Sequence, residues 1–276
     1  MEPMGTEKLP NDAVKLIQEY IAQKVERNIV NPIIRDDVFS LLQMQKDCIV
    51  LYYPYPQDSK DDNDFAGCHV ERTVSGRTVS CVFINTNNPR ERQAFAAAHE
   101  LGHILKVDQI IKQQVPSLQN DKFTEVIVNR FVAELLMPEE LFRNAFHMIR
   151  LHINKQSNRI EVGKLLRLIV YLMDYFFVPF KAVVIRFNEL NLMDAAFNKK
   201  VLDYRDSQVV KKIMKTRSGR LGFKDRAKSI RGLSSLLRKA KENGTITEKK
   251  YCEICTQFDI DMNTESPQDC VTISEG

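Results

Sequence analysis

The sequence lacks an uninterrupted hydrophobic run long enough to cross a membrane. Its most apolar stretch, residues 168–180, is broken by Asp174 and Pro179 and bounded by Arg167 and Lys181. A membrane-spanning helix needs about 20 mostly apolar residues, so this stretch is predicted to lie in a protein core. The N-terminal residues are polar and do not form an export signal. We therefore expect a cytoplasmic protein without a membrane partner.

A strong charge of one sign is also absent. The formal net charge of +4 is too small to indicate nucleic-acid binding by itself. The 6 cysteines, in a chain of 276 residues without an export signal, are predicted to be reduced thiols. The hydrophobic content of 43% allows a substantial core, built as one or two domains.

The sequence does contain a His-Glu-x-x-His pattern, His99-Glu100-Leu101-Gly102-His103, among small and apolar residues suited to a buried helix. On a helix, His99 and His103 leave the same face about one turn apart, which suits two ligands of one tetrahedral zinc ion. Glu100 lies about 100° around the helix, where its carboxylate can take a proton from water. The alternative is a chance match on an exposed helix.

Two downstream glutamates compete for the role of third ligand. Glu125 lies 22 residues after His103, which leaves room for a loop and a returning helix. Asn129 follows one turn later on the same face and could hydrogen-bond a ligand imidazole. Glu134 is nine residues from Glu125, about 900° of helical rotation, and is predicted to face the opposite way. We therefore favour Glu125.

A small β-sheet is predicted ahead of the metal-binding helix. Periodicity and β-prone runs indicate helices over residues 11–27 and 36–45, and strands over 48–53, 65–74 and 78–85. Asn88 is predicted to cap the metal-binding helix, with Pro89 as its first residue. The segment Val79–Asn85 is the nearest candidate for pairing with an extended substrate, although an ordinary core strand fits equally well.

The chain beyond the motif is predicted to be mostly helical. A polar loop at residues 113–122 precedes helices over 122–137, from Pro138 onward, over 165–177 and over 179–192. The last two have the layout of a helix-turn-helix motif, but two packed helices are the commoner arrangement.

Residues 211–241 are strongly basic, with Asp225 as their only acid. This stretch could attract phosphates or an acidic partner, or form a solvated linker. We predict three domains: a metallopeptidase domain (residues 1–155), a helical segment (156–206) and a basic, partly flexible tail (207–276). The tail is predicted to end in a helical hairpin, with Gly244 closing the first helix and Thr245 opening a capping box. We expect the tail to be unnecessary for folding.

The motifs together resemble the ImmA/IrrE family of zinc metallopeptidases over roughly residues 30–195. The resemblance rests on Arg92-Gln93-Ala94-Phe95 ahead of the His-Glu-Leu-Gly-His motif, on Glu125-x-x-x-Asn129-x-Phe131-x-Ala133-Glu134-Leu135-Leu136-Met137-Pro138, and on residues 177–192. Val128 stands where alanine is expected.

The resemblance implies an α+β fold with a zincin-like core and a mostly helical C-terminal region. His99, His103 and Glu125 would then bind Zn²⁺, and Glu100 would act as general base. The implied partner is a protein substrate, a helix-turn-helix transcriptional repressor, without direct contact to nucleic acid.

Several assignments stay open at this level. A group that stabilises the oxyanion could be His69, His147 or His152. Cys252 and Cys255 have metal-ligand spacing, but no histidine lies nearby, and we interpret them as incidental thiols. The leading functional hypothesis is a zinc endopeptidase, because a structural metal site has no use for Glu100 as a base. The second is a nucleic-acid-binding regulator with a structural zinc site.

Overall fold

The computed structural model describes residues 8–25, 32–56, 65–74, 76–154 and 160–260. The chain divides into two compact units, residues 1–227 and 228–276. The elements of the first unit are α1 (Asn11–Lys24), α2 (Val38–Gln43), β1 (Cys48–Tyr53), β2 (Gly67–Val74), β3 (Arg77–Asn85), α3 (Arg90–Ile104), α4 (Val107–Gln114), α5 (Thr124–Leu136), α6 (Glu139–Ile153), α7 (Val162–Phe176), α8 (Phe180–Glu189), α9 (Ala195–Leu202) and α10 (Gln208–Arg217). Those of the second unit are β4 (Ser229–Ile230), α11 (Leu233–Glu242) and α12 (Glu248–Gln257). This combination confirms the predicted α+β class.

The sheet of the first unit has the strand order β2-β3-β1. Strand β1 runs parallel to β3, and β2 runs antiparallel to it. Val50 and Tyr52 on β1, and Val82 and Ile84 on β3, are buried at alternate positions, as one core-facing side of a sheet requires. Strand β3 is therefore an ordinary core strand, one of the two alternatives that the sequence left open, because β1 and β2 occupy both of its edges. Strand β2 pairs with β3 along one edge and lies at an end of the strand order, so its outer edge is free among the described strands.

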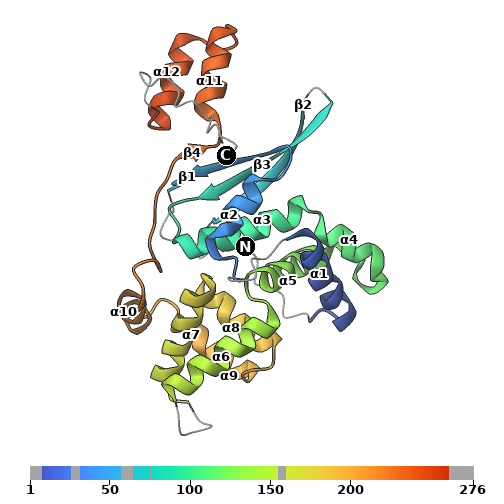
Figure 1. Cartoon of the computed structure of the whole chain (residues 1–276), viewed down its shortest axis with the longest axis vertical. Helices are drawn as coiled ribbons and strands as arrows, with labels where there is room; N and C mark the ends of the chain where they lie inside the picture. The colour runs from blue at the N-terminus through green and yellow to red at the C-terminus, as the bar shows by residue number, and fades with distance from the viewer. Residues whose placement is uncertain (1–7, 26–31, 57–64, 75, 155–159, 261–276) are drawn as a thin grey trace, which may run out of the picture. The chain divides into compact units, whose positions relative to one another are not determined.

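Helix α3 runs along one face of this sheet (Figure 1) and contacts β2 and β3. Its small residues Ala94, Ala97 and Ala98 are completely buried, which allows the close approach. The predicted cap is displaced by one residue. Pro89 is the N-cap, and the side-chain amide of Asn88 donates instead to the carbonyls of Phe65 and Asn85. The Asn88 side chain therefore connects the turn before α3 to the backbone at Phe65 and Asn85 and does not cap the helix.

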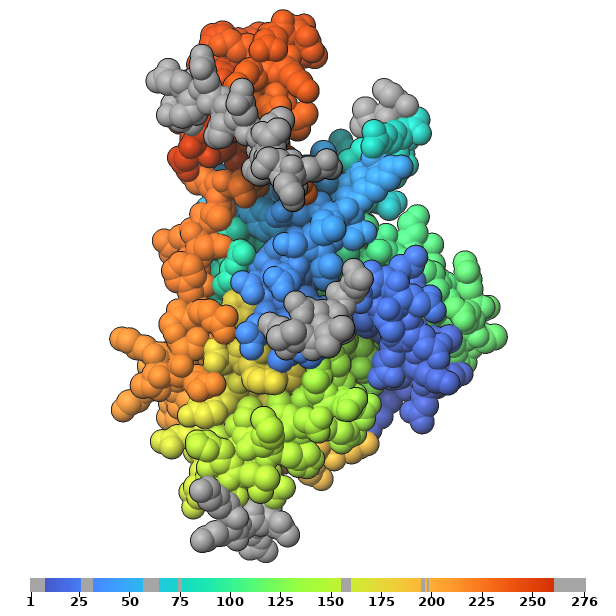
Figure 2. Space-filling model, in the orientation of Figure 1, coloured from blue at the N-terminus to red at the C-terminus, as the bar shows by residue number. Residues whose placement is uncertain are grey.

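The connection from α3 to α5 is more helical than predicted. Helix α4 begins after Lys106, whose φ of 52° turns the chain sharply, and it buries Val107 and Ile111 one turn apart. Only residues 115–123 remain between α4 and α5, and they include two 3₁₀ turns. Figure 2 shows the side chains of α1 beside those of α4 on the surface, and the two helices are in contact. Helix α5 agrees closely with its prediction.

Helices α6, α7 and α8 complete the core of the first unit. Phe142, Phe176 and Phe187, one from each helix, pack together with ring centroids 5.4 and 5.8 Å from that of Phe142. No described helix is by itself long and apolar enough to span a membrane. Only α7 and α8 together pass that test, and they are bent by 101° at their junction. The apolar stretch at residues 168–180 therefore lies in the core, as predicted.

Helix α10 belongs to the first unit rather than to an independent tail. It contacts α7, buries Val210 completely, and lies on the surface beside α7 in Figure 2. Arg217 and Arg220 form ion pairs with Asp174 of α7, at 3.2 and 3.7 Å. Two side chains of the predicted basic stretch, Arg217 and Arg220, therefore pair with an acid of the same unit. The boundary between the two units lies at residue 227, and buried residues from Leu165 to Leu221 belong to the same core cluster as those of α3.

Residues 218–227, which we call the C-terminal strap, hold the beginning of α3. The carbonyl of Phe223 accepts a hydrogen bond from the Arg90 backbone N–H. Gly222 N donates to both carboxylate oxygens of the buried Glu91, at 3.1 Å each. Asp225 forms an ion pair of 2.7 Å with the Arg90 guanidinium. The strap therefore satisfies backbone and side-chain groups that α3 would otherwise leave unpaired.

The second unit is the predicted helical hairpin. Asn243 ends α11, and Gly244 follows with a φ of 66°, where glycine avoids the steric penalty of a Cβ. The predicted capping residue is wrong: Thr247 rather than Thr245 is the N-cap of α12, and its hydroxyl accepts from Lys250 N. Residues 261–276, part of the tail predicted to be flexible, lie outside the described residues.

Candidate metal centre

The two histidines of the motif converge on the exposed side of α3. Their Nε2 atoms lie 3.2 Å apart, and their side chains are 15% and 18% exposed for His99 and His103 respectively. The separation of four residues on one helix produces this arrangement, as predicted.

The third group comes from the first turn of α5. Oε2 of Glu125 lies 3.3 Å from Nε2 of His99, and its Oε1 lies 3.4 Å from Nε2 of His103. The Glu125 side chain is 61% exposed, so the cluster opens to solvent on this side. Among the described residues, these three form the one group of histidine, cysteine and acidic side chains close enough to hold a metal ion. Cys252 and Cys255 form no such group.

The three side chains approach one another at close to the spacing of zinc ligands. Zinc bonds to nitrogen and oxygen are about 2.0–2.2 Å long, so ligand atoms around a tetrahedral ion lie about 3.3–3.6 Å apart. The two Nε2 atoms lie 3.2 Å apart, and they lie 3.3 and 3.4 Å from the two different oxygens of Glu125, so the closest contacts of the three groups are near this range. Three protein ligands also leave the fourth position open, as in catalytic zinc sites. The residues present therefore fit a metal ion.

Glycine at position 102 permits the two ligand-bearing helices to approach each other. A Cβ at Gly102 would lie 3.0 Å from Phe131 and 3.1 Å from Val128, both on α5. Because the first turn of α5 carries Glu125, this contact also sets the position of the third ligand. The Val128 side chain packs against Gly102 in the place where the family pattern suggested alanine.

The carboxylate of Glu100 lies beside the ligands and is almost buried, with the residue only 6% exposed. Burial raises the pKa of the Glu100 carboxyl above its usual range, while His99 and His103 act in the opposite direction. Oε2 of Glu100 lies 3.7 Å from Nδ1 of His69, a residue of β2. A carboxylate in this position can exchange a proton with a molecule bound at the open side of the cluster.

The ligand groups also perturb one another. Hydrogen bonding to His103 and His99 holds the pKa of the Glu125 carboxyl well below its usual range. The same contact raises the pKa of the His103 imidazole. The lowered pKa favours a negative Glu125 carboxylate, whereas the raised pKa favours a protonated His103, which must lose that proton before it can bind a metal ion.

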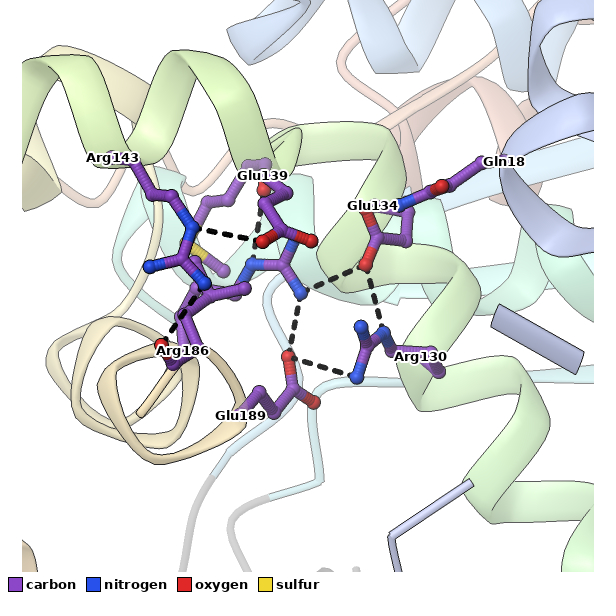
Figure 3. A network of polar contacts seen from close by, with 9 residues as sticks. Gln18, Arg130, Glu134, Glu139, Arg143, Arg186 and Glu189 are labelled. Atoms are coloured by element: carbon purple, nitrogen blue, oxygen red, sulfur yellow. Dashed lines mark hydrogen bonds and ion pairs between the residues drawn. The ribbon is translucent and has the colours of Figure 1, made fainter. Parts of the chain in front are cut away.

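The competing glutamate, Glu134, faces away from the cluster as predicted. Figure 3 shows it among the side chains of Gln18, Arg130 and Arg186. Its Oε1 accepts from Arg130 Nε at 2.8 Å and from Arg186 Nη1 at 2.9 Å, and its Oε2 accepts from Gln18 Nε2 at 3.1 Å. Burial raises the pKa of its carboxyl, but the guanidiniums outweigh burial and keep it below its usual range. Glu134 is thus a structural ion-pair partner, not a member of the cluster.

The predicted role of Asn129 is not observed. Its buried Oδ1 and the buried Nδ1 of His99 have no hydrogen-bond partner among the described residues. A bond between Asn129 and the imidazole is therefore not formed, although each side chain retains the atom that such a bond would use.

Sequence reasoning could not rank the three spare histidines, because no local pattern connects β2, which carries His69, or α6, which carries the other two, to the motif on α3. The structure brings only His69 to the cluster, where its ring stacks on that of His103 with centroids 5.7 Å apart. His147 and His152 are exposed on α6. The support given to α3 by the strap was also missed, since about 130 residues separate Glu91 from Gly222 and no local pattern connects them.

A His-Glu-x-x-His helix with a third carboxylate from a neighbouring helix defines a metallopeptidase-type site. Comparison with known families supports this class. Residues 59–188 match the peptidase M78 family, described as the IrrE N-terminal-like domain. This segment therefore forms such a domain, which confirms the resemblance to the ImmA/IrrE family. Comparisons with curated proteins and with solved structures give no significant match.

Proposed function

We propose that the protein is a zinc-dependent endopeptidase that cleaves a helix-turn-helix transcriptional repressor. The observation that carries the proposal is the cluster of His99, His103 and Glu125, whose contacts of 3.2–3.4 Å are close to the spacing of zinc ligands, beside the buried carboxylate of Glu100. A structural site would need the cluster but not the neighbouring base. The choice of a repressor as substrate rests on the resemblance to the ImmA/IrrE family.

In this proposal, His99, His103 and Glu125 would hold the zinc ion. The ion would supply Lewis acidity, which activates water near neutral pH and polarises a carbonyl. Glu100 takes the proton of the attacking water. It then passes that proton to the amine nitrogen as the peptide bond breaks. The burial of Glu100 limits its contact with bulk water during both transfers.

The free edge of β2 offers a place for an extended substrate. Asn85 N donates to Ala66 O, which makes residues 66 and 85 a hydrogen-bonded pair of the antiparallel ladder. Because such pairs alternate, Gly67, His69 and Glu71 direct their backbone N–H and C=O groups away from β3. A substrate strand pairing with these groups would lie next to the metal-binding helix.

The alternative, a nucleic-acid-binding regulator with a structural zinc site, has less support. Helix α8 would be the reading helix of the predicted helix-turn-helix layout. None of its side chains is exposed, and Val183, Arg186 and Phe187 are completely buried. Reading of bases requires side chains that reach the floor of a groove. The packing of α8 therefore favours the enzyme.

The test is cleavage of the helix-turn-helix repressor encoded beside this protein. Zinc-loaded protein is expected to produce discrete fragments, and protein treated with a chelator is expected to produce none. Glu100→Gln should bind zinc at the wild-type stoichiometry but cleave at least ~100-fold more slowly, the low end for loss of a general base. An intact repressor after incubation with the loaded wild type, or wild-type cleavage by Glu100→Gln, would contradict the proposal.

A further inference from the structure

His69 lies between the free edge of the sheet and the general base of the proposed reaction. Its backbone groups point to the free edge of β2, and its side chain reaches Oε2 of Glu100 at 3.7 Å. A substrate strand paired with β2 would thus contact this residue directly. The attacking water and the scissile carbonyl must meet in the same region, between the strand and Glu100. The inference that follows rests on the proposed function.

The imidazole of His69 is available to a substrate. Its side chain is 22% exposed, and it is not a member of the group that could hold the metal. The ring is stacked on that of His103, at an interplanar angle of 24°, so its plane is held relative to a ligand. The titratable groups that face Glu100 are those of His99, His103, His69, Glu125 and Cys68. Of the three histidines, only His69 can donate a hydrogen bond to a substrate while the candidate ligand group stays complete.

The position of His69 is set by close packing of β2 on α3. Gly67 lies two residues earlier, on the same face of the strand. A Cβ at Gly67 would lie 3.0 Å from the Phe83 carbonyl oxygen and 3.4 Å from Cβ of Ala96 on α3. Glycine here allows the strand to lie against the helix, and His69 is carried to the cluster as a result.

We infer that His69 is a further catalytic residue. Its imidazole N–H donates a hydrogen bond to the oxygen of the scissile carbonyl, and this bond strengthens as that oxygen gains negative charge during attack by water. One well-placed donor of this kind contributes about 10²–10³-fold to kcat. The residue acts on the transition state, so its loss lowers kcat while substrate binding is nearly unchanged.

The test compares three variants of His69 with the wild type, using the repressor as substrate. His69→Ala removes the donor, whereas His69→Asn and His69→Gln place an amide N–H near the positions of Nδ1 and Nε2. We expect His69→Ala to lower kcat about 100-fold with KM within about threefold, and one amide variant to recover at least tenfold. Zinc stoichiometry should stay at the wild-type value in all three. His152→Ala, on the exposed end of α6, is the matched control.

A binding measurement gives a readout independent of turnover. The probe is a phosphinic peptide with the residues of the cleaved bond, whose tetrahedral anion resembles the transition state. His69→Ala should bind it about 100-fold more weakly than the wild type does. Its affinity for intact repressor, measured in the Glu100→Gln background, should be unchanged.

Three results would overturn the role of His69: a kcat within about threefold of the wild type, equal loss of affinity for repressor and probe, or loss of zinc from His69→Ala. In each case, a wild-type protein that cleaves the repressor still supports the proposed function. A wild type that neither cleaves the repressor nor binds the probe overturns the proposed function itself, and the role of His69 with it.

Discussion

At the scale of single residues, two glutamates on one helix have opposite tasks. Glu125 faces the histidines and is largely exposed, while Glu134 is buried against Arg186 and Arg130. Glu125 can exchange its contacts with the two histidines for a bond to a metal ion, and this exchange leaves no buried charge unpaired. Removal of Glu134 would take from the completely buried guanidinium of Arg186 one of its two carboxylate partners, the other being Glu189.

Substitution of each glutamate should therefore separate metal binding from stability. Glu125→Ala should weaken zinc binding by more than the about 10–100-fold that loss of a supporting residue costs, with little change in folding. Glu134→Ala should keep its zinc but lose about 1–3 kcal/mol of the free energy of unfolding, because the buried Arg186 loses one of its two carboxylate partners and keeps only Glu189. Metal analysis after dialysis and denaturant titration of the chelated proteins measure the two effects. The opposite pattern of zinc contents would transfer the ligand role to Glu134.

At the scale of elements, the site depends on how closely α3 and α5 approach each other. Glycine is normally unfavourable in a helix interior, by up to about 1 kcal/mol relative to alanine. At position 102, however, alanine would not fit without movement, because Phe131 and Val128 occupy the space that its Cβ needs. The contact stabilises the pair of helices that bring the three ligands together.

Gly102→Ala should lower the melting temperature despite the better helix propensity of alanine. Overpacking a well-packed contact costs about 1–3 kcal/mol, and movement of α5 should also weaken zinc binding. Gly163→Ala is the control, since this glycine is exposed in the first turn of α7 and no atom lies within 4 Å of the added Cβ. That variant should be as stable as the wild type or more stable. A Gly102→Ala protein that is stabilised and keeps its zinc would show that the contact has no role in the site.

At the scale of the whole molecule, the peptidase unit extends well beyond the segment that matches the family. Residues 59–188 match, but the unit continues to residue 227 through α10 and the C-terminal strap. The strap supports the beginning of α3, the helix that carries both histidines. We therefore propose that the part of the chain needed for folding ends near residue 227 rather than at residue 206.

Two truncations distinguish these boundaries. A protein ending at Ala227 should keep its zinc and its melting temperature, because it contains the complete first unit. A protein ending at Asp206 loses Val210 and the strap, and it leaves the buried Glu91 without its donor. Each unpaired buried polar group costs about 1–3 kcal/mol, so this protein should melt at a lower temperature or fail to fold. Calorimetry and zinc analysis compare the two, and equal behaviour would show that the strap contributes nothing to α3.

Local patterns in the sequence selected the candidate site residues and located most of the elements. The spacing of His99 and His103 fixes their common face because a helix has 3.6 residues per turn, and the nine residues from Glu125 to Glu134 place these two on opposite faces. The same periodicities located the three strands and the helices α3, α5 and α7. The errors at Asn88 and Thr245 are shifts of one or two residues at helix ends, where competing caps differ little in energy.

Tertiary structure alone decided which elements meet. The order β2-β3-β1 places β2 at an edge of the sheet, and pairing partners are not encoded in the alternation of a single strand. His69 lies 31 residues before Glu100, and Gly222 lies about 130 residues after Glu91, yet both pairs are in contact. Such contacts depend on the packing of the entire core, which local sequence periodicity does not describe. For this reason the motif was enough to select the candidate ligands, whereas the folded chain was needed to find His69 and the strap.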